Sequence, residues 1–498
     1  MPPGDAEEDI IRFWTAIGLT LVLSAVGLTY EIAAGRVLAP YFGTSLLTWT
    51  AVIATVLAGF SLGSAVGGFV AEGERRTAAG TVRWALVATA VLMALSPTAL
   101  GLVHAMGARG TGGMLLGVFL AFFPASVLVT VPSPFLAKLA VEARPGREGS
   151  SLGLVLAAGS TGAIAGAILA GFVALPLFGS VATFAGCGAA ALLCLLFLRD
   201  GPPEGGRTGA GPEPIVTVAA TAFVALAGIA GGPVCLYESG LSCIHVVRED
   251  GEVRLYSDGT TQAAERIVED GPAAEPPALA LSYTRWLWAR LDRDLGPAPS
   301  VLFIGGGGYT LPTRLLGARP DARAVAVEID PLVTQVVRTH LPRAASMIER
   351  TGFEPGNDGP EGRLGIVHAD GRVYLNETDR RFDAVVVDAF SSGSVPAHLA
   401  TRETYARLRE IVDGPVYVNL IDVPGGPLAR GLHAILTELW PHVEAVEGPL
   451  SSRGRVNTLL AASSDPLPPL ETLPEGYEPV RIPHGRAFTD DRGWVGHR

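Results

Sequence analysis

The sequence predicts a multi-pass bundle of transmembrane α-helices followed by a globular α/β domain. Three observations lead to this fold class. The 498-residue chain is 49% hydrophobic and only 17% charged, its long apolar runs are confined to the first half, and strand and helix patterns alternate in the second half. The same change in composition predicts three parts: a helical domain over residues 1–235, a β-hairpin segment over 236–277 and an α/β domain over 278–498.

The first half contains seven apolar stretches, each near the length of about 20 residues that a helix needs to cross a bilayer. The first stretch runs on into a charged segment and not into a small-residue cleavage site, so we expect it to be retained as a helix. We therefore expect a multi-pass protein of the cell membrane, in contact with lipid. The stretches cover residues 13–34, 47–71, 84–106, 114–137, 151–178, 181–198 and 215–235.

Basic residues follow the second, fourth and sixth apolar stretches, and the positive-inside rule assigns such loops to the cytoplasm. The N-terminus would then lie inside as well, and seven full crossings would place the globular half outside. A Gly-Gly-Pro sequence interrupts the seventh stretch, so the sequence leaves the side of the globular half open. The basic residues are Arg75, Arg76, Arg83, Lys138, Arg144, Arg147, Arg199 and Arg207.

Small residues recur at four-residue spacing in two of the stretches, at Gly59, Gly63 and Gly67 and again at Gly162 and Gly166. This spacing lets helix backbones approach closely. The close approach would serve packing within the chain or the interface of a homodimer.

The first stretch also holds two ionisable residues, Glu31 and Arg36. Charged groups at that depth are costly, so the pair lies either at the membrane interface or in a polar cavity. The cysteines show neither a C-x-x-C motif nor clustering with histidine, and we expect all four to pack structurally and to bind no metal. They are Cys187, Cys194, Cys235 and Cys243.

In the second half, two alternating apolar runs flank Asp250-Gly251, a sequence typical of a β-hairpin turn. Five strand patterns then alternate with helical ones: VLFIG, AVAVEID, LGIVHAD, DAVVVDAF and VYVNLID. This alternation predicts a doubly wound sheet with a mostly parallel core, whose ligands bind at the carboxyl ends of the strands.

The net charge of −11 argues against a nucleic-acid partner.

Glycines and acids mark one edge of that predicted sheet. Gly305, Gly306, Gly307 and Gly308 follow the first strand, and Glu328 ends the second strand twenty residues later, the spacing at which an acid reaches ribose hydroxyls. Asp370 and Asp388 end the third and fourth strands. Since no Walker lysine follows the glycines, a nucleoside is favoured over a triphosphate. An adenosylsulfonium such as S-adenosylmethionine needs no phosphate cradle.

Residues 236–450 resemble the spermidine synthase family of polyamine aminopropyltransferases, and the whole chain resembles the membrane-fused members of that family. The matching stretches are YSDGTTQ, VLFIGGGGYTLPTRLL, AVEIDPLV, HADGRVYL, FDAVVVDAF and VPAHLATRETY. The resemblance implies a Rossmann-like domain of the S-adenosylmethionine-dependent methyltransferase type. Its substrate would be decarboxylated S-adenosylmethionine or a related adenosylsulfonium, with no tightly bound cofactor.

The resemblance also implies roles for individual residues. Glu328 would hold the ribose, Asp370, followed by Gly371, would read the adenine amino group, and Gln262 would line the nucleoside pocket. Asp388 would be the catalytic acid/base, and Tyr283 falls near the place where the family keeps a catalytic tyrosine.

Three departures from the family concern the amine half of the pocket. Gly308 stands where the family has an aspartate that grips the ammonium of the aminopropyl group, and Ser391 stands where it has an acid that helps to hold the diamine. A second active-site tyrosine has no counterpart, because no tyrosine occurs between Tyr417 and Tyr477.

Three functions fit this pattern. The first is aminopropyl transfer to a polyamine acceptor. The second is cleavage of an adenosylsulfonium to 5′-methylthioadenosine without a diamine, since the carboxylate of intact S-adenosylmethionine could close a five-membered lactone. The third is a transporter or sensor with a silent nucleoside-binding domain, but Asp388 argues against it because binding alone needs no base at that position.

Overall fold

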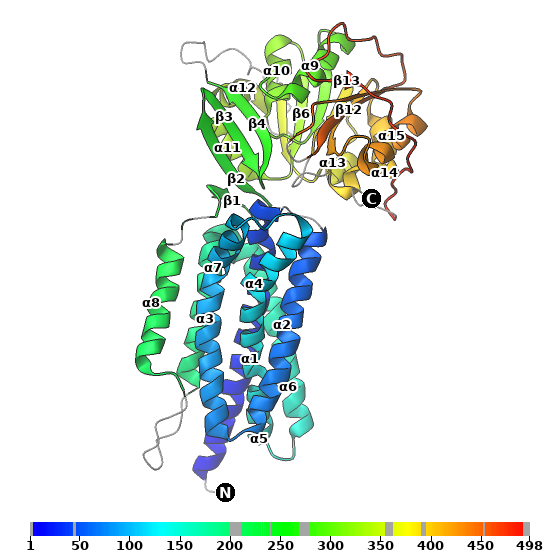
Figure 1. Cartoon of the computed structure of the whole chain (residues 1–498). Helices are drawn as coiled ribbons and strands as arrows, with labels where there is room; N and C mark the ends of the chain where they lie inside the picture. The colour runs from blue at the N-terminus through cyan, green and yellow to red at the C-terminus, as the bar shows by residue number, and fades with distance from the viewer. Residues whose placement is uncertain are drawn as a thin grey trace. The chain divides into compact units, whose positions relative to one another are not determined.

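The computed structural model describes residues 3–42, 46–198, 211–230, 232, 234–239, 241–267, 279–353, 362–389, 395–451 and 454–491. The chain divides into two compact units, Met1–Cys243 and Ile244–Arg498 (Figure 1). Arg199 and Arg207, two of the basic residues used to predict topology, lie outside the described residues.

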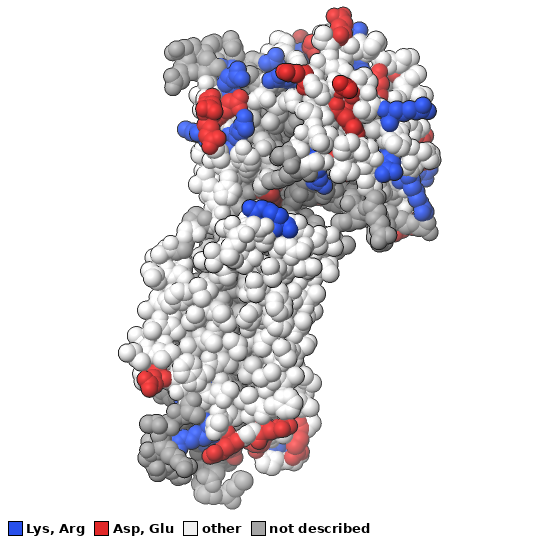
Figure 2. Space-filling view, in the orientation of Figure 1, with Lys and Arg blue, Asp and Glu red and all other residues white. Residues whose placement is uncertain are grey.

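The first unit is a bundle of long helices (Figure 1). On the face shown in Figure 2 its flank carries few charged side chains, and large apolar side chains such as Phe69, Phe172 and Ile229 are more than three-quarters exposed. A surface of this composition suits contact with lipid. The helices are α1 (Pro3–Phe42), α2 (Leu46–Glu72), α3 (Arg75–Ala105), α4 (Gly110–Thr130), α5 (Pro132–Glu142), α6 (Glu148–Leu169), α7 (Leu175–Leu193) and α8 (Pro214–Ala230).

Five of the described helices are long and apolar enough to cross a membrane, by length and composition. The seven predicted stretches are grouped differently in this count for two reasons. The fifth and sixth stretches form one helical segment, Glu148–Phe197, interrupted at Gly179 by a non-helical backbone (φ 74, ψ 176). The seventh forms α8, an apolar helix that is shorter than these five, at 17 residues.

The small-residue repeats pack helices within the chain. A Cβ added at Gly63 would lie 2.0 Å from the Val127 carbonyl oxygen of α4, and one added at Gly162 would lie 2.1 Å from the Leu21 carbonyl oxygen of α1. Only glycine permits backbones this close. The homodimer, the other alternative for these repeats, stays a prediction. Glu31 and Arg36 are 8% and 7% exposed, so both lie inside the bundle and not at its surface.

A disulfide joins Cys235 to Cys243. The packing role expected for all four cysteines is therefore wrong for this pair, although Cys187 and Cys194 are free and buried as expected. Within the loop that the disulfide closes, the Glu238 carboxylate accepts a hydrogen bond from the Ser180 amide at 3.1 Å and another from the Ser180 hydroxyl. This contact fixes the loop beside the turn between α6 and α7.

A small antiparallel sheet follows, in the order β1-β2-β3-β4. Glu249 pairs with Glu252 across a two-residue turn, in which Asp250 and Gly251 both have positive φ, 51° and 74°. This is the backbone of a tight hairpin turn, and the predicted hairpin is confirmed. The strands are β1 (Tyr237–Glu238), β2 (Cys243–Glu249), β3 (Glu252–Ser257) and β4 (Thr260–Arg266).

The second unit contains a nine-stranded sheet in the order β13-β11-β12-β10-β9-β5-β6-β8-β7. Strands β10, β9, β5, β6 and β8 are parallel neighbours, and β12 pairs with β10 in the antiparallel direction. The predicted α/β fold class is confirmed. The strands are β5 (Ser300–Ile304), β6 (Arg323–Glu328), β7 (Gly352–Phe353), β8 (Leu364–His368), β9 (Ala384–Val387), β10 (Val416–Asp422), β11 (His442–Glu447), β12 (Val456–Ser463) and β13 (Glu478–Pro479).

The apolar face of the sheet packs against helices. A core of buried side chains joins the central strands to the helices near the C-terminus, with Leu302, Val385, Val418, Tyr405 and Leu432 essentially inaccessible. The connecting helices are α9 (Ser282–Asp294), α10 (Thr310–Ala318), α11 (Pro331–His340), α12 (Pro342–Thr351), α13 (Gly371–Glu377), α14 (Arg402–Ile411) and α15 (Pro427–Leu439). Parallel strands held in this way bring their carboxyl ends to one edge.

Candidate active site

The glycine loop between β5 and α10 needs glycine at two positions for its conformation. Gly305 and Gly307 have φ of 101° and 48°, in the region that side chains disfavour. Tyr309, the residue before α10, also adopts a left-handed conformation at φ 53°, with its side chain fully buried. The surrounding structure must hold such a residue in a backbone conformation that non-glycine residues disfavour. Conformations of this kind are common at ligand sites.

Position 308 needs glycine because there is no room for a side chain, and not because of its backbone conformation. It is absent from the positive-φ residues among the described glycines, but a Cβ added there would lie 2.2 Å from the Cβ of Ala263 on β4. Because Ala263 is buried and its Cβ is fixed to the backbone, it cannot move aside. The methyl group of Ala263 therefore occupies the space that a side chain at position 308 would need.

Glu328 at the end of β6 holds the glycine loop. One carboxylate oxygen accepts hydrogen bonds from the amides of Gly306 at 3.0 Å and Gly307 at 3.1 Å, and the other accepts one from the Asp330 amide at 3.1 Å. Burial raises the pKa of Glu328, and these three amides oppose that rise because they stabilise the charged form. Its contact with ribose stays a prediction.

Asp388, directly after β9, is held by two side chains. Its Oδ2 accepts a hydrogen bond from the Tyr283 hydroxyl at 3.1 Å, and its Oδ1 accepts one from Asn419 Nδ2 at 2.8 Å. Asn457 Nδ2 in turn donates to Asn419 Oδ1 at 2.9 Å. Burial raises the pKa of Asp388 to about 6, while the bonds from Asn419 and Tyr283 act in the opposite direction. The carboxyl group can thus exchange a proton near neutral pH.

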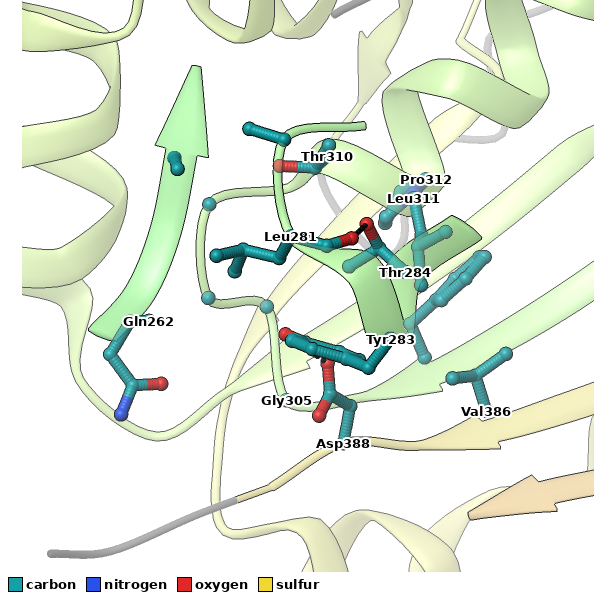
Figure 3. A pocket seen from close by; sticks show the side chains of 16 residues that line it. Gln262, Leu281, Tyr283, Thr284, Gly305, Thr310, Leu311, Pro312, Val386 and Asp388 are labelled. Atoms are coloured by element: carbon teal, nitrogen blue, oxygen red, sulfur yellow. Dashed lines mark hydrogen bonds between the residues drawn. The ribbon is translucent and has the colours of Figure 1, made fainter. Parts of the chain in front are cut away.

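These groups share one pocket. Gln262, Tyr283, the four glycines and Asp388 are among its lining residues, and Figure 3 shows the Tyr283 ring and the Asp388 carboxylate meeting beside Gly305, with Gln262 on the other side of the glycine loop. Tyr283 comes from the first turn of α9 and Gln262 from β4, so three separate parts of the unit build the pocket. Near Asp388, burial and the negative carboxylate raise the pKa of Tyr283 well above its ordinary value.

Three of the predicted site residues lie outside the lining of this pocket. Glu328 contacts the backbone amides of the glycine loop, as described above, but does not line the pocket. Asp370 caps α13, accepting from the Arg372 amide at 2.8 Å, and its other oxygen lies 2.9 Å from His398 Nε2. Gly371 is buried, and a Cβ there would lie 2.7 Å from Ile304 Cγ2. The adenine contact of Asp370 stays a prediction.

Sequence reasoning missed the two asparagines and one tyrosine. Asn419 is the single amide side chain in the apolar strand VYVNLID, and a buried amide in such a strand is a signal that could have been used. Tyr477 is 5% exposed, and burial raises its pKa while an interaction with Ser282, next to Tyr283, acts in the opposite direction. This contact could not be predicted from the sequence, because Tyr477 belongs to the segment after β12, far along the chain from Ser282. Ser391 lies outside the described residues.

No family model matches the chain. A polyamine aminopropyltransferase from Korarchaeum cryptofilum is 29% identical over 120 residues, which cover 24% of this chain and 34% of that protein. Polyamine aminopropyltransferase 1 from Streptomyces coelicolor is 25% identical over 452 residues, covering 84% of this chain and 77% of that protein. A probable spermidine synthase structure from Corynebacterium glutamicum covers 47% of this chain and 81% of its own, at 20% identity and a TM-score of 0.38.

The similarity to the Streptomyces protein extends beyond the globular unit, because that unit is only about half of the chain. Fold and site define a Rossmann-like α/β domain joined to helices that are long and apolar enough to cross a membrane. The chain is a relative of the polyamine aminopropyltransferase (spermidine synthase) family at modest identity, with N-terminal apolar helices that suggest the membrane-fused form. The resemblance inferred from the motifs is confirmed.

Proposed function

We propose that the chain is a membrane-integrated aminopropyltransferase-like enzyme. Its substrate would be decarboxylated S-adenosylmethionine or a related adenosylsulfonium, its acceptor a polyamine, and its product 5′-methylthioadenosine. The observation that carries this proposal is the position of Asp388. A carboxylate whose pKa is raised to about 6 lies beside a side-chain-free glycine loop, in the pocket that also holds Tyr283.

In this reaction the nitrogen of an amine attacks the carbon beside the sulfonium. The carbon–sulfur bond breaks, its electron pair stays on sulfur, and neutral methylthioadenosine leaves. An alkylammonium of pKa about 10 must first lose a proton, and Asp388 would accept it. Tyr283 and Asn419 would hold the two carboxylate oxygens in position through the hydrogen bonds described above.

The test uses the purified full-length chain. It is incubated with decarboxylated and with intact S-adenosylmethionine, each with and without putrescine, and methylthioadenosine is measured. Aminopropyl transfer predicts release only from the decarboxylated substrate with the diamine present, together with spermidine. An Asp388→Asn variant is the matched control, because it changes the carboxylate to an amide of the same size. Binding of adenosyl ligands without any turnover would instead favour the transporter or sensor.

A second function is favoured by the packing at Gly308. The resemblance places an ammonium-gripping aspartate at this position, and here the methyl group of Ala263 occupies the space. Without that acid, the pocket would not repel the carboxylate of intact S-adenosylmethionine. Its carboxylate oxygen could then attack the carbon beside the sulfonium, which forms a lactone and releases methylthioadenosine without any acceptor. Release from intact S-adenosylmethionine in the absence of putrescine would identify this reaction.

A further inference from the structure

We propose that the catalytic unit, Ile244–Arg498, lies on the non-cytoplasmic, oxidising side of the membrane. In this arrangement the Cys235–Cys243 disulfide closes where the chain leaves the helical bundle on that side. Helix directions locate the disulfide loop at one end of the bundle. Loop charge and the disulfide then assign that end to the same side of the membrane by independent arguments.

Helix directions place the disulfide loop at the end of the bundle opposite the N-terminus. Gly162 and Gly166 of α6 approach Leu21 and Ala25 of α1 in the same order, so these helices run parallel. In α7 the order is reversed, because the ring of Phe184 contacts Tyr30 at 5.3 Å and the later Cys187 contacts Val26. The chain therefore turns back near Gly179.

The contact between Glu238 and Ser180 places the disulfide loop beside that turn. Helix α8 leads to it from the other end of the bundle, since a Cβ added at Gly211, before α8, would lie 3.1 Å from Arg83 Nη1 near the start of α3. Figure 1 shows the same course of α8 within this unit. The chain thus leaves the bundle at the end where α6 turns into α7.

Basic side chains gather at the opposite end, around the start of α1. The Arg144 guanidinium, after α5, lies 4.6 Å from the centre of the Phe13 ring. Lys138 of α5 donates to the Ala71 carbonyl oxygen at 2.6 Å, which puts the end of α2 at the same level. This end of the bundle therefore carries Arg75 and Arg76 in the first turn of α3, and Arg144 and Arg147 in the α5–α6 connection.

The end that carries the disulfide is poor in basic residues. Its α3–α4 connection lies near the end of α1, because the His104 ring contacts the Tyr41 ring at 5.0 Å, and it carries Arg109. Four arginines at the N-terminal end of the bundle, against one in this connection, is the asymmetry described by the positive-inside rule. The rule assigns the N-terminal end to the cytoplasm and the disulfide end to the other side.

The disulfide leads to the same side by different chemistry. Disulfides persist in oxidising compartments and are reduced in the cytoplasm. Joining the two thiols releases two protons and two electrons. A protein disulfide of the oxidising compartment would take them by thiol–disulfide exchange and become a dithiol. The two remaining cysteines, Cys187 and Cys194, are buried in helices, and no cysteine follows Cys243 in the sequence.

The first test counts thiols in the full chain, expressed in a bacterial inner membrane. Cells are quenched in acid, the protein is denatured, and maleimide-polyethylene glycol is added with or without prior reduction. The proposal expects two additions without reduction and four after it. The Cys235→Ser variant should show three additions without reduction, because Cys243 loses its partner. Four additions to the unreduced wild-type chain would overturn the proposal.

The second test places a reporter thiol on either side. Ser464, after β12, and Ser150, at the start of α6, are both exposed. We expect a membrane-impermeant maleimide to label Ser464→Cys in intact spheroplasts, and to label Ser150→Cys only after permeabilisation, with a cytoplasmic thiol protein as the control for integrity. Any protection of Ser464→Cys in intact cells, or labelling of Ser150→Cys there, would overturn the proposal. Neither test measures turnover, so failure of the proposed enzymatic function leaves both outcomes unchanged.

Discussion

Removing the amide that holds Asp388 should shift the pH dependence of the reaction. Asn419 is 2% exposed and donates to Asp388 Oδ1 at 2.8 Å. This bond stabilises the charged carboxylate, so its loss raises the pKa of Asp388 above the value of about 6. A hydrogen bond to a charged group contributes about 1.5 to 3 kcal/mol, and one pKa unit corresponds to about 1.4 kcal/mol. With partial compensation by Tyr283, we expect a rise of about one unit in Asn419→Leu.

The assay is the initial rate of methylthioadenosine release from pH 5 to pH 9. For a base with a pKa of about 6, the rate rises as pH increases through 6 and levels off above it. A one-unit shift lowers the charged fraction at pH 6.5 from about three-quarters to about one-quarter, which makes the variant about threefold slower there and nearly equal at pH 9. An inflection that stays in place or moves to lower pH would refute this reasoning.

The matched control is Thr458→Val. Thr458 is buried on β12 beside Asn457, but its hydroxyl donates to Glu447 and not to the network around Asp388. This variant loses one buried hydrogen bond of comparable kind, so it reports any general effect of destabilising the sheet. We expect its pH profile to keep the wild-type inflection.

Three further predictions concern the same pocket. Asp388→Asn should retain adenosyl binding in calorimetry and lower turnover by about 100-fold or more, because the amide cannot accept the proton; equal turnover would remove Asp388 as the base. Glu328→Ala should weaken adenosyl binding by about 1 to 3 kcal/mol, and unchanged affinity would show that Glu328 only supports the loop. Gly308→Asp alone should weaken the binding of decarboxylated and intact S-adenosylmethionine together, because its Cβ would meet Ala263 at 2.2 Å. Only in the double variant with Ala263→Gly should the two affinities move in opposite directions, which competition binding would measure.

The five parallel strands of the second unit were predictable from the sequence because each is a short apolar run that alternates with helical segments. The apolar runs of β5, β6 and β9 are buried almost throughout, as strands of a parallel core must be. The glycine loop, Glu328 and Asp388 were predictable for a related reason. Parallel strands end at a common edge, so residues that follow different strands are brought together by topology alone.

The contacts that define the pocket's chemistry depended on tertiary structure. Tyr283 meets Asp388 across 105 positions of the chain, and Asn419 reaches it from the neighbouring strand. The small size of residue 308 reflects the position of Ala263, which belongs to a different sheet. No local pattern reports such pairs, because they depend on strand order and on the packing of α9.

In the helical unit, too, some features follow from the sequence and others only from the tertiary structure. The length of the apolar stretches was enough to predict that the first half consists of apolar helices. In such helices the residues that face lipid and those that face the core are both apolar. The pairing of Cys235 with Cys243 and the contact of its loop with Ser180 were decided only in three dimensions. The physical reason is that composition measures the affinity of a segment for an apolar environment, whereas a disulfide or a contact between loops requires two particular segments to meet.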